Sequence, residues 1–317
     1  MPEIKEKITT EIKRLLDEGL VDVVIGFKKE ESPLRPQPAF FRKVDDLADL
    51  EYNGLCQNNL ANYLTRYPPE TRIGIVVRGC ENRSVNALIV EHQHPRENLF
   101  LIGVPCQGII DIKKIIAEVG EEISEFNEDG DEVILVAQGK THTFKRHELL
   151  HDSCLRCVHP NPVSADVVIG EPLPVGDLEA IREAVEGFEA LSKEERYAWF
   201  KEESERCIRC YACREACPMC YCTECFVDNA TPRWTESDIS PAGTQAWHLI
   251  RAFHQTGRCT SCGACERACP MDIKMTYLTD KLNKDMYDNF EFVAGMECET
   301  QPPFASFNLD DKKRFVV

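Results

Sequence analysis

Residues 207–218 read Cys207-Ile-Arg-Cys210-Tyr-Ala-Cys213-Arg-Glu-Ala-Cys217-Pro218, and residues 259–270 repeat this spacing as Cys259-Thr-Ser-Cys262-Gly-Ala-Cys265-Glu-Arg-Ala-Cys269-Pro270. The spacing is typical of [4Fe–4S] ferredoxin sites, in which the fourth cysteine of one run ligates the cluster of the other run. The two-residue gaps let a tight turn aim three thiols at one small object. We therefore predict cluster one on Cys207, Cys210, Cys213 and Cys269, and cluster two on Cys259, Cys262, Cys265 and Cys217.

Zinc is the alternative ligand for any single run of this kind. Two complete runs that both end in Cys-Pro favour iron–sulfur clusters instead. We therefore interpret the chain as a protein that carries electrons, with a zinc-rich interaction module as a rival that would be colourless.

The overall composition narrows the class of protein. The chain has 317 residues, enough for two domains, and a formal net charge of −17, which argues against a nucleic-acid binder and against charge-driven membrane attachment. Seventeen cysteines would suggest disulfides in a secreted chain, but the N-terminus has no apolar signal core. No stretch approaches the apolar length of a membrane span. We expect a cytoplasmic protein without membrane insertion, in an anaerobe or a protected complex.

The first part of the chain is predicted to be an α/β domain with a parallel-sheet core and a β-hairpin. Residues 72–77 and 99–104 are continuous apolar runs, as expected for buried parallel strands linked by right-handed crossovers. The other predicted elements are helices over 4–16, 58–67, 85–91 and 109–119, strands over 21–27 and 39–42, a hairpin of 121–126 with 132–137, and a strand over 141–146.

The second part is predicted to be a mostly α-helical dicluster ferredoxin domain, because a helix over 243–254 separates the two cysteine runs. Further helices are predicted over 177–191, 193–205 and 271–282. Beyond about residue 290 the periodicity is lost. We expect an α/β cluster-binding domain over 1–175, the ferredoxin domain over 176–290, and an irregular tail over 291–317 that contacts a partner or the chain's own surface.

A third cluster is predicted in the α/β domain. Cys80 and Cys106 each follow a buried strand, and neighbouring strands about 4.8 Å apart would bring both thiols to one cluster. Cys154-x2-Cys157 supplies a chelating pair. We predict that Cys80, Cys106, Cys154 and Cys157 hold a third [4Fe–4S] cluster, with Cys56 as a substitute for one of them. The alternative is that Cys80 and Cys106 are small core residues.

Several other residues have two interpretations. Arg78 and Arg83 flank Cys80, and could offset cluster charge or hold a flavin phosphate, although such arginines are more often ion-pair residues. Cys220, Cys222 and Cys225 could hold a fourth cluster, with Cys56 or Cys298 as fourth ligand. We favour a supporting role around cluster two, because this run matches no known ligand spacing.

No residue is assigned a catalytic role. The chain has no G-x-G-x-x-G or Walker motif, and no Ser–His–Asp arrangement can be argued. His248 and His254 fall in a predicted helix, where we interpret them as packing or polar-face residues rather than ligands.

The motifs of the first domain resemble the beta subunit of deazaflavin-coenzyme-reducing hydrogenases and formate dehydrogenases. The matching segments are Val77-Arg-Gly-Cys80-Glu-Asn-Arg83, Ile102-Gly-Val-Pro-Cys106-Gln-Gly108, and Cys154-x2-Cys157 followed by Pro160-Asn-Pro162. The second half resembles the dicluster ferredoxin fused to such domains, through Cys207-Ile-Arg-Cys-Tyr-Ala-Cys213 and Arg258-Cys-Thr-Ser-Cys-Gly-Ala-Cys265. The resemblance covers most of residues 50–285.

This resemblance implies an iron–sulfur electron-relay subunit of a larger oxidoreductase. Its partners would be other redox subunits: a formate dehydrogenase, a hydrogenase or a flavoprotein of the heterodisulfide-reductase type. Full-length members also carry a flavin that meets the coenzyme, whereas this first domain is short and shows no flavin motif. The alternative is therefore a subunit that binds FAD and itself reduces or oxidises a deazaflavin or nicotinamide coenzyme. A redox sensor with one labile cluster is a further rival.

Overall fold

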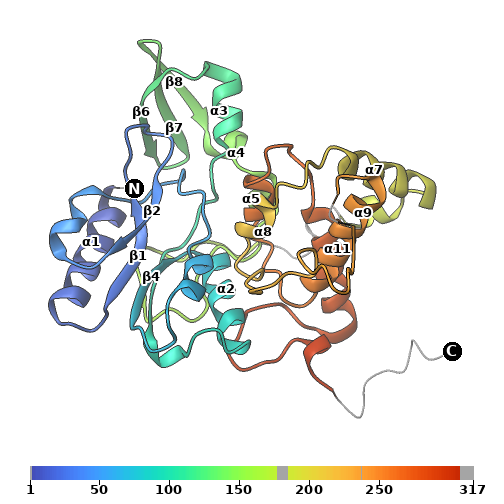
Figure 1. Cartoon of the computed structure of the whole chain (residues 1–317). Helices are drawn as coiled ribbons and strands as arrows, with labels where there is room; N and C mark the ends of the chain where they lie inside the picture. The colour runs from blue at the N-terminus through green and yellow to red at the C-terminus, as the bar shows by residue number, and fades with distance from the viewer. Residues whose placement is uncertain (1, 177–184, 237, 308–317) are drawn as a thin grey trace.

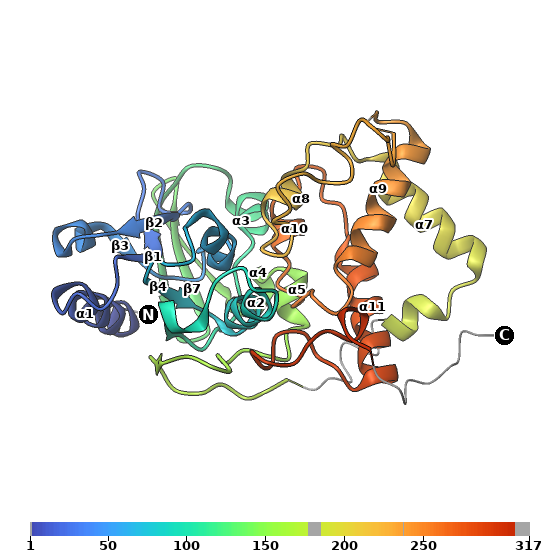
Figure 2. The same cartoon turned by 60° about the horizontal axis from the view of Figure 1, so that its bottom comes forward.

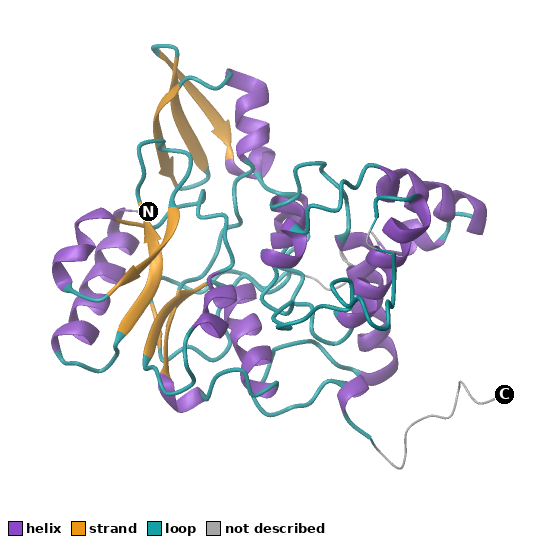
Figure 3. Cartoon of the chain, in the orientation of Figure 1, coloured by secondary structure: helices purple, strands orange, loops and turns teal. Residues whose placement is uncertain are grey.

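The computed structural model describes residues 2–176, 185–236 and 238–307 of the chain. An α/β region is followed by a mostly helical region, as Figure 1 and Figure 3 show. The predicted fold class is confirmed: the first region contains a largely parallel sheet and a small antiparallel sheet.

The main sheet has six strands, and they span Val23–Lys28 (β1), Gln37–Phe41 (β2), Leu50–Glu51 (β3), Ile73–Val77 (β4), Leu99–Gly103 (β5) and Val167–Val168 (β9). Their order is β2-β1-β4-β5-β9, with β3 paired to β1. Strands β1, β4, β5 and β9 are parallel to one another, whereas β2 and β3 run antiparallel to β1. All of β4 is buried, as expected for a parallel strand covered on both faces.

Two helices cover the main sheet from opposite sides, α1 (Pro2–Asp17) and α2 (Gly79–Val90), as Figure 1 and Figure 2 show. Helix α1 buries Ile8, Ile12 and Leu15, whose spacing places them on one helical face. Three 3₁₀ helices lie in the connections of this region: Val44–Asp49 (η1), Leu60–Arg66 (η2) and Arg96–Asn98 (η3).

The small sheet forms the top of the molecule in Figure 1. It is an antiparallel meander of β6 (Ile123–Asp129), β7 (Glu132–Ala137) and β8 (Lys140–Lys145). Helix α3 (Ile112–Val119) precedes it, and the single-turn helices α4 (Arg146–Leu149) and α5 (Asp152–Leu155) follow. Val133 and Leu135 pack with Ile115 of α3 in a second apolar core.

Among the residues described, the helical region contains three long helices, α7 (Lys193–Glu205), α9 (Pro241–His254) and α11 (Thr276–Phe290). Single-turn helices α8 (Ala212–Glu215) and α10 (Ala264–Arg267) lie inside the two cysteine runs. Trp247 of α9 is buried, and its ring lies 5.1 Å from that of Tyr211 and 5.6 Å from that of Phe226. Helix α9 thus supplies the apolar centre around which the first cysteine run folds.

The segment after α11 returns to the α/β region and runs along α2. Asn86 donates a hydrogen bond to the Gly295 carbonyl at 2.9 Å, and Gln301 donates one to the Val90 carbonyl at 3.3 Å. A last 3₁₀ helix, η4, spans Pro303–Ala305. Residues up to at least Gln301 therefore contact the chain's own surface.

The structure differs from the sequence-based expectations at several boundaries. Helix α2 begins at Gly79, directly after β4, rather than near residue 85. The helix expected over 58–67 is the 3₁₀ helix η2, and β9 was not predicted. Of the helix predicted over 177–191, residues 177–184 lie outside the described residues, and residues 185–189 are helical. Within the described ranges, no helix is both long and apolar enough to cross a membrane.

Candidate metal centre

The parallel pairing of β4 with β5 brings two of the predicted third-cluster ligands together. The register pairs Val77 with Gly103, the last residues of the two strands. Cys80 and Cys106 each follow their strand end by three residues. The two thiols therefore emerge at the same edge of the sheet, beyond the carboxyl ends of the strands, where ligands of open α/β sheets bind.

Gly79 allows the close approach of the chain that carries the other two cysteines. A Cβ at this position would lie 2.2 Å from the carbonyl oxygen of His159 and 2.8 Å from that of Asn161. Only glycine fits there without moving the loop. The start of α2, which carries Cys80, is thus held against the segment that follows Cys157.

Cys154 and Cys157 reach the same place from α5 and the residues after it. The Ile109 amide donates to Cys154 Sγ at 3.2 Å, and the Gly108 amide donates to Cys106 Sγ at 3.3 Å. Burial raises the pKa of Cys106 to about 11, and the neighbouring Cys154 and Cys157 add to the rise. The structure therefore brings together all four predicted ligands: Cys80, Cys106, Cys154 and Cys157, which we call ligand group three.

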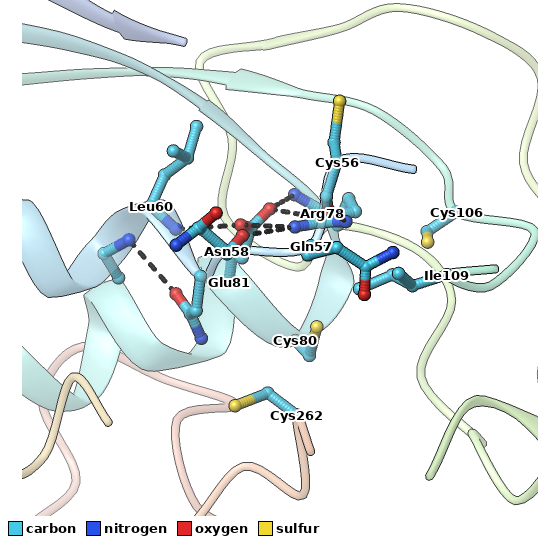
Figure 4. A network of polar contacts seen from close by, with 12 residues as sticks. Cys56, Gln57, Asn58, Leu60, Arg78, Cys80, Glu81, Cys106, Ile109 and Cys262 are labelled. Atoms are coloured by element: carbon cyan, nitrogen blue, oxygen red, sulfur yellow. Dashed lines mark hydrogen bonds and ion pairs between the residues drawn. The ribbon is translucent and has the colours of Figure 1, made fainter. Parts of the chain in front are cut away.

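These four cysteines line a cavity of about 400 Å³ between the α/β region and the helical region. Two cysteines of the second run, Cys259 and Cys262, also line it. Figure 4 shows Cys262 next to Cys80. Burial raises the pKa of Cys80 well above its usual value, and the largest further contribution is the charge of Cys262.

Ligand group one comprises Cys207, Cys210, Cys213 and Cys269, the ligands predicted for cluster one. All four line one small hollow beside Trp247 and His248. Burial raises the pKa of Cys213, and Cys207, Cys269 and Cys210 raise it further, although Arg251 lowers it. The fourth cysteine of the second run therefore lies with three cysteines of the first, as the spacing predicts.

Ligand group two comprises Cys259, Cys262, Cys265 and Cys217, the ligands predicted for cluster two. Burial raises the pKa of Cys259 to about 12, and both Cys262 and Cys217 contribute to the rise. Burial also raises the pKa of Cys265, again with contributions from Cys217 and Cys262. The fourth cysteine of the first run is thus a neighbour of the second run.

The remaining cysteines are distributed around these groups. The side chains of Cys220 and Cys217 are hydrogen-bonded, which raises the pKa of Cys217 and lowers the pKa of Cys220. Gln255 Nε2 donates to Cys220 Sγ at 3.3 Å. Cys222 is exposed. Cys298 Sγ donates to Asn86 Oδ1 at 3.1 Å. This arrangement agrees with a supporting role of Cys220 beside group two.

Cys56 lies apart from the cavity. It is fully buried in the core of the main sheet, the Asn53 amide donates to its sulfur at 3.5 Å, and it does not line the large cavity. In Figure 4 its sulfur points away from Cys80. Burial raises the pKa of this thiol to about 12. These observations favour a core residue over a substitute ligand.

The two arginines that flank Cys80 differ in their partners. Arg78 is buried and forms an ion pair with Glu81 at 2.8 Å, and it donates to the carbonyls of Cys56 and Asn58 (Figure 4). Its charge is therefore neutralised within the chain. Arg83 is also buried, but it lines the large cavity and donates to the carbonyls of Ala294 and Thr260.

Sequence reasoning did not single out Arg251, which lies among the cysteines of groups one and two. Its side chain is buried, and Nη2 donates to the Cys213 carbonyl at 3.1 Å. The sequence could have indicated that Arg251 is buried, because it follows Trp247 by four residues and therefore lies on the same, buried face of α9. His248 also lines the hollow of group one, and burial lowers its pKa to about 4, so its ring is neutral.

The three groups fit iron–sulfur clusters. Each consists of four thiols, the ligand type such clusters require, and the two groups that line cavities stand around open space. No set of three or more His, Cys, Asp or Glu side chains is close enough to hold a single metal ion among the residues that the structure describes. This finding agrees with thiols that surround a [4Fe–4S] cluster, because a cluster is larger than a single metal ion.

Comparison with known proteins supports the same chemistry. Residues 203–273 match the 4Fe-4S dicluster domain family. The F420-dependent formate dehydrogenase subunit beta of Methanocaldococcus jannaschii is 24% identical, over 94% of this chain and 93% of its own. The F420-dependent formate dehydrogenase 1 subunit beta of Methanococcus maripaludis is 26% identical, over 93% of this chain and 92% of its own. This chain is similar over nearly its whole length to formate dehydrogenase beta subunits.

The resemblance predicted from the sequence is thereby confirmed, together with the dicluster ferredoxin part. A chain of the F420-reducing [NiFe] hydrogenase complex of Methanosarcina barkeri matches 50% of this chain and 63% of its own. Its sequence identity is 16% and its TM-score is 0.41. Iron–sulfur clusters are the cofactor class that these comparisons support, with an electron-transfer role.

Proposed function

We propose that this chain is the iron–sulfur electron-relay subunit of a larger oxidoreductase complex, with clusters one, two and three in that order along the path. The observation that carries the proposal is the position of ligand group two between the other groups. Cys265 lines the hollow of group one, and Cys262 lies beside Cys80 of group three.

A [4Fe–4S] cluster supplies one-electron redox chemistry when it is bound. The residues of the chain hold the clusters through thiolates and donate backbone hydrogen bonds to the ligand sulfurs. Such bonds reach Cys106 from Gly108, Cys154 from Ile109, and Cys207 from Arg209 at 3.4 Å. Hydrogen bonds to sulfur, together with burial, set the reduction potential. The relay needs no acid or base from the chain.

Each end of the proposed path has an exposed cysteine. Cys210 of group one and Cys157 of group three are exposed, whereas every cysteine of group two is partly or largely covered. Electrons would enter at one end and leave at the other. We infer a catalytic partner at one end, of the formate dehydrogenase, hydrogenase or heterodisulfide-reductase type, and a second redox partner at the other.

We divide the chain at about residue 176, with groups one and two in the second domain and group three in the first. Residues 292–294 line the cavity of group three, and Arg83 donates to the Ala294 carbonyl. The start of the tail would therefore close this cavity rather than contact a partner.

Purification of the complex through a tag on this chain, under anaerobic conditions, tests the relay. Addition of the catalytic partner's substrate, formate or hydrogen, should reduce the clusters of this chain within the turnover time, as followed by electron paramagnetic resonance. Clusters that stay oxidised while the complex turns over would contradict the proposal.

A second candidate function is a flavin-containing subunit that reduces or oxidises a deazaflavin or nicotinamide coenzyme. It is favoured by the volume of the group-three cavity, about 400 Å³, which lies within the range of cofactor pockets. Flavin absorbance from the purified, denatured chain would support this candidate, and its absence would remove it.

A further inference from the structure

Arg83 and Arg251 are buried arginines that have no carboxylate partner among the described residues. Arg83 and Arg251 are each 5% exposed. Within the described ranges, neither forms an ion pair, whereas Arg78 pairs with Glu81 and Arg146 pairs with Glu128. A buried charge without a counterion costs several kcal/mol. The two guanidinium groups therefore require a negative charge that Asp and Glu side chains do not provide.

Arg83 lies between ligand groups two and three. It follows Cys80 by one turn of α2, and its guanidinium donates to the Ala294 carbonyl at 3.0 Å and to the Thr260 carbonyl at 3.4 Å. Burial lowers its pKa. The charges that oppose this effect come from Cys80 and Cys157 of group three and from two cysteines of group two, Cys259 and Cys262.

Arg251 lies between ligand groups one and two. Its Nη2 donates to the Cys213 carbonyl, but its buried Nε has no hydrogen-bond partner among the described residues. The thiol charges that act on it come from Cys217 and Cys265 of group two, from Cys220, and from Cys213 of group one. Each arginine thus faces two neighbouring groups rather than one.

Arg209 is a third buried arginine without an ion pair among the described residues. Its charge lowers the pKa of Cys207 of group one, and its guanidinium donates to the Tyr211 hydroxyl and to backbone carbonyls.

We propose that Arg83 and Arg251 are fixed counterions of the two junctions in the relay: Arg83 between clusters two and three, and Arg251 between clusters one and two. Each raises the reduction potentials of the two clusters that it faces and weakens the repulsion between neighbouring reduced clusters. The inference rests on the proposed relay, since it presupposes clusters in all three ligand groups.

The physical basis is that one-electron reduction adds one negative charge to a buried cluster. When an electron moves along the relay, one cluster loses it and its neighbour gains it, so the negative charge stays within reach of the same guanidinium. A partner reductase or, in the test below, dithionite supplies the electron. Arginine suits this role because its charge does not change at any physiological pH.

The test is a dithionite titration of the anaerobic holoprotein, followed by electron paramagnetic resonance, with Arg83→Gln and Arg251→Gln beside the unmodified chain. Arg83→Gln should raise the oxidised-to-reduced ratio of clusters two and three about tenfold at a fixed potential, equivalent to about 59 mV for a one-electron step, and should leave cluster one unchanged. Arg251→Gln should shift clusters one and two and leave cluster three unchanged.

Two controls distinguish the loss of the arginine charge from a structural effect of the substitution. Arg83→Lys and Arg251→Lys retain the charge and should restore most of the shift. Arg72→Gln removes the same net charge at an exposed ion pair with Asp22, at the opposite end of β4, and should shift none of the clusters. If a glutamine variant loses iron, the matching lysine variant should keep it.

The possible failures are distinguishable. Fewer than three clusters in the unmodified chain would contradict the proposed relay itself. Three clusters whose potentials do not move in the glutamine variants, or move equally in all variants including Arg72→Gln, would overturn the role of the arginines. Loss of iron from both the glutamine and the lysine variants would also overturn it, because charge alone would not then account for the effect.

Discussion

The last cysteine of each run, Cys217 or Cys269, connects that run to the other run. Cys269 ends the second run but lies with Cys207 and Cys213, and Cys217 ends the first run but lies beside Cys259 and Cys265. The spacing predicts this exchange because it belongs to the dicluster pattern. The proximity of the thiols is observed, while ligation of the clusters stays a prediction.

Replacement of Cys262 tests ligation at the centre of the relay. Cys262→Ser should lower the iron content by about four atoms per chain and stop transfer between the other two clusters, because cluster two would lose one of its thiolates. Cys222→Ser, at an exposed cysteine outside the three groups, is the matched control and should keep its iron. Unchanged iron and turnover in Cys262→Ser would refute the assignment.

Gly79 offers a test of group three that leaves every cysteine in place. Gly79→Ala would put a Cβ 2.2 Å from the His159 carbonyl oxygen, so the loop after Cys157 must move away from Cys80. We expect a destabilisation of about 1–3 kcal/mol and loss of the third cluster, measured by thermal unfolding and iron content.

The control for this substitution is Gly187→Ala. Nothing lies within 4 Å of a Cβ at Gly187, which is in a helical segment, so alanine should be neutral or stabilise by about 0.5–1 kcal/mol. An iron content that is equal in the two variants would contradict the role given to Gly79.

At the scale of elements, the strand register accounts for most of what the sequence predicts about group three. The apolar runs of β4 and β5 predict adjacent buried strands, and adjacency places Cys80 and Cys106 at one edge. The start of α2 at Gly79 was missed, because the helix opens with Gly79 and Cys80, two residue types of low intrinsic helix propensity. The contacts of Gly79 with the loop at His159 are tertiary, and no local pattern reports them.

The link between α2 and the returning segment depends on Asn86. This side chain is fully buried, donates to the Gly295 carbonyl, and accepts hydrogen bonds from Ser164 and Cys298. Asn86→Ala should destabilise the protein by about 1–3 kcal/mol, because buried polar partners would be left unpaired. Limited proteolysis should then cut the segment after α11 sooner.

Asn289→Ala is the matched control for this link. Asn289 is exposed and bonds only to the Asp285 carbonyl of its own helix among the described residues, so its loss should leave both stability and proteolysis unchanged. Equal proteolysis of the Asn86 and Asn289 variants would show that Asn86 does not hold the segment.

At the scale of the whole molecule, charged contacts join the two regions around the cysteine groups. Lys274 pairs with Asp152 at 2.9 Å, Arg156 pairs with Asp280 at 3.4 Å, and Arg267 donates to the Gln57 carbonyl. These contacts fix group two against group three. No sequence pattern indicated them, so the order of the clusters could not be predicted before the two regions were seen together.

The presence of three [4Fe–4S] clusters in one chain can be checked by measuring iron and acid-labile sulfide per chain after anaerobic purification. We expect about twelve of each, falling to about eight in the double variant Cys154→Ser/Cys157→Ser. About eight in the unmodified chain, unchanged in that double variant, would contradict a cluster in group three and with it the three-cluster relay.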